Sequence, residues 1–183
     1  MIVGHSALES HNRKFLYYRE DDAIDKVIWT VLNGKNGAKI CWGQNGYHSY
    51  NINAIIAETH KVQEDYNKVS GYRIRREYVI VEKDELHKDR GYDEMILFAH
   101  RYSLYYNKQA IQVVWAVYDR GNIYYMDIAI NPVSPYTGLK YRNNKEIAWD
   151  QDAYANALLC EITGRSEHKI LDDWIEYMPP LPI

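Results

Sequence analysis

The sequence predicts an α+β domain in which a mainly antiparallel sheet of about five strands is covered by helices on one face. Two apolar runs, 111–118 and 123–130, are separated only by residues 119–122 (DRGN), which predicts a central antiparallel hairpin. Residues 72–82 alternate between two faces, as expected of another strand. Amphipathic segments of helical spacing lie between and after these runs, so we expect helices to pack on the sheet.

Two further runs flank a glycine-containing stretch near the start of the chain. Residues 25–32 (DKVIWTVL) and 38–42 (AKICW) are rich in β-branched and aromatic side chains, which predicts a second hairpin with both runs as strands. Helices are expected in four segments with apolar side chains at helical spacing, at 49–69, 92–107, 145–163 and 170–177. The expected order of elements is therefore β-β-α-β-α-β-β-α-α.

The chain has 183 residues and contains no repeat, low-complexity tract or linker-like stretch, which predicts one domain. We interpret the polar residues 1–24 as an N-terminal arm, residues 25–178 as the α+β domain, and residues 179–183 as a tail.

Composition excludes several classes of protein. No apolar run approaches the roughly 20 residues that span a bilayer, and residues 1–10 are too polar for a signal peptide, so we expect no membrane association and a cytoplasmic location. Cys41 and Cys160 are too few for a disulfide scaffold or a four-thiolate zinc site. The formal net charge of −3 argues against a uniformly basic nucleic-acid binder but leaves room for a local basic face.

Tyrosine is unusually frequent, with 18 Tyr and 5 Trp against 2 Phe. Because tyrosine combines an apolar ring with a polar tip, it suits base stacking and wet interfaces as well as cores. The sequence contains no phosphate-binding loop, dinucleotide fingerprint, zinc-hydrolase motif or serine-hydrolase motif, so no common catalytic class is indicated.

Asp127 is a lone carboxylate in the apolar run 123–130, on the same predicted face as Tyr125. Burying an unpaired carboxylate costs several kcal/mol, so Asp127 needs a partner or a cation. One interpretation is a structural pair with an arginine or a tyrosine hydroxyl. The other is that Glu77 or Glu82, on the neighbouring strand, completes a minimal oxygen site for Mg²⁺ or Mn²⁺. The sequence leaves both open.

The segment 112–141 resembles the metal-binding segment of plasmid mobilisation relaxases, which belong to the HUH endonucleases. In that family one strand ends in His, a short turn follows, and the next strand carries His-x-His before an Asn and a TGKKY-like loop. The three histidine places are held here by Tyr118, Tyr125 and Asp127, and the Asn and the loop by Asn131 and residues 137–141 (TGLKY). Weaker similarity at 28–35 and 68–82 extends the resemblance over most of residues 25–164 and implies a relaxase-like fold.

The resemblance also implies a mechanism that this chain cannot follow unchanged. Relaxases polarise the scissile phosphate with a cation held by three imidazoles and attack it with a tyrosine. Here phenols, with an ordinary pKa near ~10, replace two of the imidazoles. Trp29 stands in the place of a nucleophilic tyrosine, so relaxase-type DNA nicking is expected to be lost.

Candidate site residues follow from the alternation and the resemblance together. The candidate catalytic residues are Asp127, Tyr125, Tyr118 and Glu82, and a Mg²⁺ or Mn²⁺ site would use Asp127 and Glu77. Candidate nucleic-acid contacts, for phosphate binding or stacking, are Arg73, Arg75, Arg76, Tyr124, Lys140 and Arg142, with Tyr125 and Trp29 as further stacking positions.

Three functions are compatible with these residues. A short degenerate relaxase domain resembles some anti-CRISPR proteins of Gram-positive phages and conjugative elements, some of which act on Cas9 and its guide RNA, including by shortening the guide. That resemblance implies a mobile-element protein acting in the bacterial cytoplasm, and an acidic chain suits the basic nucleic-acid channels of Cas9. The alternatives are a carboxylate-dependent single-strand nuclease centred on Asp127, and a non-catalytic DNA-binding accessory of plasmid mobilisation.

Overall fold

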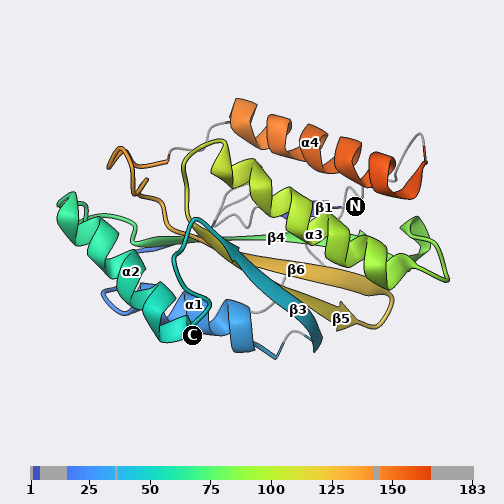
Figure 1. The fold of residues 1–183 in the computed structure, drawn as a ribbon, viewed down its shortest axis with the longest axis horizontal. Helices are drawn as coiled ribbons and strands as arrows, with labels where there is room; N and C mark the ends of the chain where they lie inside the picture. Colours follow the sequence, from blue (N-terminus) through green and yellow to red (C-terminus); the bar gives the residue numbers. More distant parts are fainter. Residues whose placement is uncertain (1, 5–15, 36, 142–144, 166–183) are drawn as a thin grey trace.

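An antiparallel sheet runs through the middle of the protein and carries helices on both of its faces (Figure 1). The computed structural model describes residues 2–4, 16–35, 37–141 and 145–165. The strands are β1 (Ile2–Gly4), β2 (Leu16–Tyr18), β3 (Ala38–Asn45), β4 (Ile74–Glu82), β5 (Val113–Arg120) and β6 (Ile123–Ile130). Their order in the sheet is β1-β4-β6-β5-β3, and β2 also pairs with β4.

The two short N-terminal strands lie along one edge of β4. β1 pairs with residues 78–80 of β4 and β2 with residues 74–76, both antiparallel. Because they occupy successive stretches of the same edge, the sheet is five strands across, which confirms the expected antiparallel α+β class. Residues 2–4 and 16–18 of the expected N-terminal arm are therefore part of the sheet, whereas the expected helix 170–177 and the tail lie outside the described residues.

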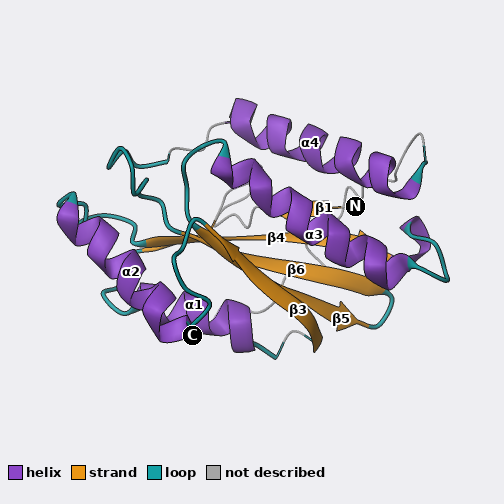
Figure 2. Cartoon of the chain, in the orientation of Figure 1, coloured by secondary structure: helices purple, strands orange, loops and turns teal. Residues whose placement is uncertain are grey.

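In the described part of the chain, helices cover both faces of the sheet (Figure 2). α1 (Ala23–Asn33) and α2 (Ile52–Asp65) lie on one face, and α3 (Gly91–Asn107) and α4 (Lys145–Thr163) on the other; a short helix, η1 (Lys83–Glu85), follows β4. The expectation of helices on one face was wrong. β4 and β6 are buried along almost their whole length, so each face of the sheet needs its own apolar cover, and two separate hydrophobic cores result.

The run 25–32 forms α1 rather than the expected strand. The buried apolar side chains of α1 recur at the helical spacing i, i+3, i+4, i+7, i+8: Ile24, Val27, Ile28, Val31 and Leu32. A strand would place Val27 and Ile28 on opposite faces, but both are buried, and the next residue, Trp29, is 54% exposed. Tertiary packing thus overrides the β propensity of these residues, and β3 pairs with β5 instead of forming a hairpin.

The remaining elements agree with the sequence analysis. β5 and β6 form the central hairpin, and β4 lies on the other side of β6. The helices expected at 49–69, 92–107 and 145–163 are present as α2, α3 and α4. No helix in the described part of the chain is long and apolar enough to cross a membrane.

The assignment of α1 can be tested with two adjacent substitutions. Ile28→Ala leaves a cavity beneath the sheet and is expected to lower the free energy of unfolding by about 2–5 kcal/mol. Val27→Ala, on the same buried face of the helix, should also lower it, by about 1–3 kcal/mol, whereas a strand would place Val27 and Ile28 on opposite faces. Urea unfolding followed by circular dichroism measures both, and a loss at only one of the two positions would contradict the helical assignment.

Candidate nucleic-acid interface

The three residues that stand in the relaxase histidine places come together in the structure, but they lie in the core. Tyr118 pairs with Tyr125 across the β5–β6 hairpin, and Asp127 lies two residues further along the same face. That face is covered by α1, where the Tyr118 hydroxyl donates a hydrogen bond to the Val31 carbonyl at 2.7 Å. The ring of Tyr78 stacks on Tyr125 with their centroids 5.5 Å apart.

Burial also determines the protonation of these phenols. Burial, helped by the nearby Asp127 charge, raises the pKa of Tyr118 to about 12 and that of Tyr125 well above its ordinary value. Both hydroxyls therefore stay protonated at neutral pH, and a protonated phenol is a poor metal ligand and a poor nucleophile.

Asp127 is paired with an arginine on the adjacent strand. Arg76 donates from Nε and Nη2 to the two carboxylate oxygens of Asp127, at 2.8 and 2.7 Å, and both residues are buried. Although burial lowers the pKa of Arg76, the Asp127 charge and hydrogen bonds outweigh it and raise the pKa above its ordinary value. Of the two interpretations of Asp127, the structural pair is the one observed.

The other carboxylates do not join Asp127. Tyr78 is the residue of β4 that pairs with Asp127, so its neighbour Glu77 points to the opposite face of the sheet. There Glu77 is ion-paired with Arg75 and accepts a hydrogen bond from the Tyr106 hydroxyl. Glu82 shares the face of Asp127 but lies four residues beyond the pairing position, about 13 Å along the strand.

This arrangement does not support the expected Mg²⁺ or Mn²⁺ site. Asp127 and Glu77 are separated by the sheet itself and cannot bind the same cation. Among the residues that the structure describes, no group of three His, Cys, Asp or Glu side chains is placed to hold a metal ion.

Most of the expected nucleic-acid contacts are also inside the protein. Arg73 donates from Nε to the Gln63 side chain at 3.0 Å, and the Arg75 guanidinium lies 4.9 Å from the centre of the Tyr141 ring. Four of the expected contacts are buried, namely Arg73, Arg75, Arg76 and Tyr124, as is the stacking candidate Tyr125. Arg142 lies outside the described residues. The buried arginines hold the fold together and are not available to phosphates.

Lys140 differs, because it reaches the surface next to other cations. Its ammonium group donates to the backbone carbonyls of Ser70 and Tyr72, at 2.6 and 3.3 Å, and lies 4.9 Å from the centre of the Tyr72 ring. Partial burial and the positive charges of Lys68 and Arg73 lower the pKa of Lys140. A concentration of positive charge therefore exists beside the 132–141 loop.

Exposed apolar side chains surround this charge. Tyr136 and Leu139, in the loop after β6, are 74% and 71% exposed, the highest values for large apolar side chains in the described chain. The Tyr66 hydroxyl donates to the Pro135 carbonyl at 3.0 Å, and Gly138 packs against the Tyr66 ring. We call the resulting surface the loop corner, formed by Tyr66, Lys68, Val69, Tyr72, Tyr136, Leu139 and Lys140.

The loop corner combines two features of proteins that bind single-stranded nucleic acid. Exposed rings offer stacking surfaces that tolerate any base, and lysines attract the phosphate backbone. The sequence analysis identified Lys140 but missed Tyr66, Tyr136 and Leu139. The available signal was the proline-flanked segment 132–139 (PVSPYTGL), where turn residues enclose large apolar side chains that cannot be buried in a short loop.

Comparison with known proteins adds no relatives: no family model, curated protein or solved structure matches the chain.

Removing the Asp127 charge tests whether this residue is structural. Asp127→Asn leaves Arg76 buried without its counter-charge and should lower the free energy of unfolding by about 3–5 kcal/mol. The double variant Arg76→Met/Asp127→Leu, which replaces both charges by apolar groups, should recover much of that loss. Thermal and urea unfolding measure the difference. An Asp127→Asn protein as stable as the unmodified protein would contradict the structural assignment.

The packing of the loop corner can be tested at its glycine. Gly138 has a φ of +67°, and a Cβ there would collide with the Tyr66 ring. Gly121, in the β5–β6 turn, has a similar φ of +65° but open space around it. Gly121→Ala should therefore cost only the backbone strain of about 1–2 kcal/mol, and Gly138→Ala measurably more. Equal losses in urea unfolding would show that the contact with Tyr66 is absent.

Proposed function

We propose that this protein binds single-stranded nucleic acid, free or within a nucleoprotein, through the loop corner and does not cut it. The observation that carries the proposal is the exposure of Tyr136 and Leu139 beside Lys140 and Lys68. Large apolar side chains gathered on a surface commonly mark an interaction site. Stacking on such side chains is worth about 1–3 kcal/mol per base.

The centre of the sheet favours binding over cleavage. Tyr118, Tyr125 and Asp127 are enclosed by α1 and engaged in internal contacts, so neither a scissile phosphate nor a catalytic cation has access to them. This argues against the alternative of a nuclease centred on Asp127.

The resemblance to relaxase-like anti-CRISPR proteins supports a specific partner. On this proposal the chain is a mobile-element protein that inhibits Cas9 loaded with guide RNA, in the cytoplasm of a bacterial host, by occupying the guide or its channel. A net charge of −3 suits contact with a basic channel, and the loop corner supplies the local contact with exposed nucleotides.

A DNA-binding accessory of plasmid mobilisation is the second candidate. It is favoured by the TGLKY segment at 137–141, which resembles the corresponding loop of relaxases and contributes Leu139 and Lys140 to the loop corner. The two candidates differ in the ligand, because the accessory would prefer free single-stranded DNA over the Cas9 complex.

Binding and cleavage can be tested in one experiment. The purified chain is incubated with labelled single-stranded DNA, free guide RNA, and guide RNA loaded on Cas9, each with Mg²⁺ or with EDTA. We expect a gel shift that weakens with salt, because phosphate contacts release counterions, and strands of unchanged length in every lane. Tyr136→Ala should weaken binding about tenfold, as expected for one lost stacking contact.

Tyr50→Ala is the matched control, since Tyr50 is 66% exposed and lies outside the loop corner. Equal effects of the two substitutions would contradict the proposed surface. Strands shortened in Mg²⁺ but not in EDTA would contradict binding without cleavage, and the absence of any shift would contradict the proposed function as a whole.

A further inference from the structure

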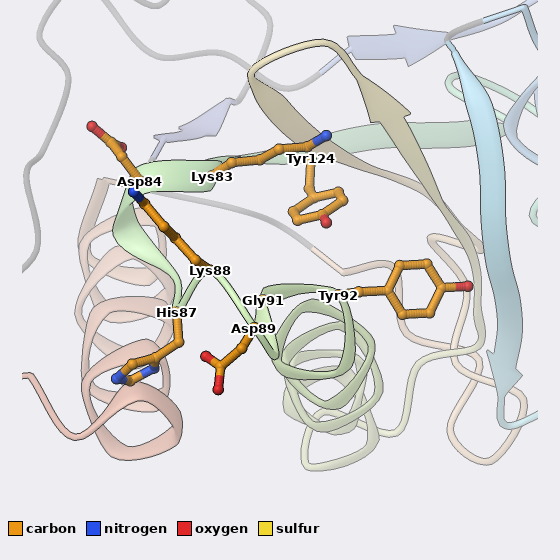
Figure 3. A pocket seen from close by; sticks show the side chains of 8 residues that line it. All are labelled: Lys83, Asp84, His87, Lys88, Asp89, Gly91, Tyr92 and Tyr124. Atoms are coloured by element: carbon orange, nitrogen blue, oxygen red, sulfur yellow. The ribbon is translucent and has the colours of Figure 1, made fainter.

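A cavity lies at the other end of β4, where the chain passes through η1 into α3. Its volume is about 410 Å³, at the lower end of the range for small-molecule sites. The residues that line it are Lys83, Asp84, His87, Lys88, Asp89, Gly91, Tyr92 and Tyr124 (Figure 3). None of these residues belongs to the loop corner.

Two tyrosines from different elements provide its apolar surfaces. Tyr124 projects from β6, and Tyr92 from the first turn of α3, where it is 50% exposed. In Figure 3 the Tyr124 ring lies above Gly91, where a Cβ would meet the Leu86 side chain, so the chain packs closely at this side of the cavity. A flat ring is the ligand shape that such surfaces accommodate best.

The charged residues at the cavity are of both signs. The Lys83 ammonium group is held between the two carboxylate oxygens of Asp119, at 2.7 and 2.8 Å, and lies 4.9 Å from the centre of the Tyr124 ring. Lys88 and Asp89 are exposed at the rim. A ligand with both an anionic group and hydrogen-bond donors would therefore find complementary groups at this site.

His87 lines the cavity, but its ring is hydrogen-bonded to Glu94 and is not turned toward the tyrosine rings. Its Nδ1 is 2.7 Å from a carboxylate oxygen of Glu94, which also accepts from the His87 backbone N–H at 3.0 Å, and in Figure 3 its ring lies away from Tyr124. Although burial raises the pKa of Glu94, the hydrogen bonds from His87 and the charge of Arg90 outweigh it and lower the pKa. This pair fixes the turn between η1 and α3.

We propose that the cavity binds one unstacked nucleotide of a single strand, a deepening of the proposed function on which it rests. The base stacks on the half-exposed ring of Tyr92 and contacts the edge of Tyr124, which is buried apart from the part that lines the cavity. Its exocyclic amino group donates to Asp89, and its phosphate contacts Lys88. A nucleotide matches the aromatic walls, the mixed charges and the size of the cavity. A basic side chain of a protein partner would use the carboxylates and rings but leave Lys88 opposed by a like charge.

The test uses the full chain and nucleoside 5′-monophosphates. Isothermal titration is carried out with AMP, GMP, CMP and UMP, with inorganic phosphate, and with a blocked lysine as a basic side chain. We expect at least one monophosphate to bind more tightly than phosphate or lysine. Tyr92→Ala should weaken that binding about fivefold or more, and Lys88→Ala should weaken it and reduce its salt dependence.

Leu97→Ala is the control, because Leu97 is 47% exposed on α3 and does not line the cavity. Circular dichroism checks that each variant is folded. The proposal is overturned if no monophosphate binds, if phosphate alone binds as tightly, if lysine binds in preference, or if Leu97→Ala has the effect of Tyr92→Ala.

Failure here can be distinguished from failure of the proposed function. Strand binding that depends on Tyr136 but is unaffected by Tyr92→Ala, together with no binding of monophosphates, would overturn the cavity and leave the loop corner standing. Monophosphate binding that depends on Tyr92 but not on Tyr136 supports the cavity independently.

Discussion

A buried ion pair between Arg76 and Asp127 joins β4 to β6 and constrains the core around it, because either charge alone would destabilise the fold. Both charges lie beneath α1 and α2, where a charge without its partner would cost several kcal/mol. The neighbouring residue of β4, Arg75, is engaged on the opposite face with Glu77. Adjacent arginines of β4 thus each neutralise one buried carboxylate, one on each face of the sheet. Only the pair with Asp127 joins β4 to β6, because Glu77 belongs to β4 itself.

This arrangement explains why the sheet centre carries no open site. The positions that resemble relaxase ligands are buried: Tyr118 donates to the Val31 carbonyl, Asp127 pairs with Arg76, and the Tyr125 ring stacks on another tyrosine ring. A ligand therefore finds accessible groups at the periphery instead. Exposed aromatic side chains are found at both ends of β4: the loop corner beside Tyr72 at its start, and the cavity that begins at Lys83 after its end. The two lie roughly 30 Å apart along the strand, within the reach of a short single strand.

The sequence alone predicted the helices and strands whose residue patterns are local. The alternation in β4 and β6 and the short turn between β5 and β6 predicted the antiparallel sheet, and helical spacing predicted α2, α3 and α4. The sequence alone did not predict α1, because its β-branched residues at helical spacing are compatible with both a strand and a helix. Only packing against the sheet selects the helix. The shared face of Tyr125 and Asp127 was predictable, but alternation alone could not show that Arg76 would be the partner of Asp127, or that Arg73 and Arg75 would be buried.

The high tyrosine content has two structural causes. In the core, some hydroxyls bind groups that phenylalanine would leave without a partner, as Tyr118 does with the Val31 carbonyl and Tyr47 with Thr59. At the surface, Tyr136 and Tyr92 present rings to solvent. Composition could not separate the two groups, because burial depends on contacts between distant segments.

Photocrosslinking of the full chain to a single strand containing 4-thiouridine, followed by mass spectrometry of the linked peptides, shows whether the loop corner contacts nucleic acid. We expect crosslinks to the 132–141 loop and the end of α2, reduced by an excess of unlabelled strand. Crosslinks concentrated on Trp29 or Tyr50, which are exposed but lie outside the loop corner, would show that the strand binds elsewhere.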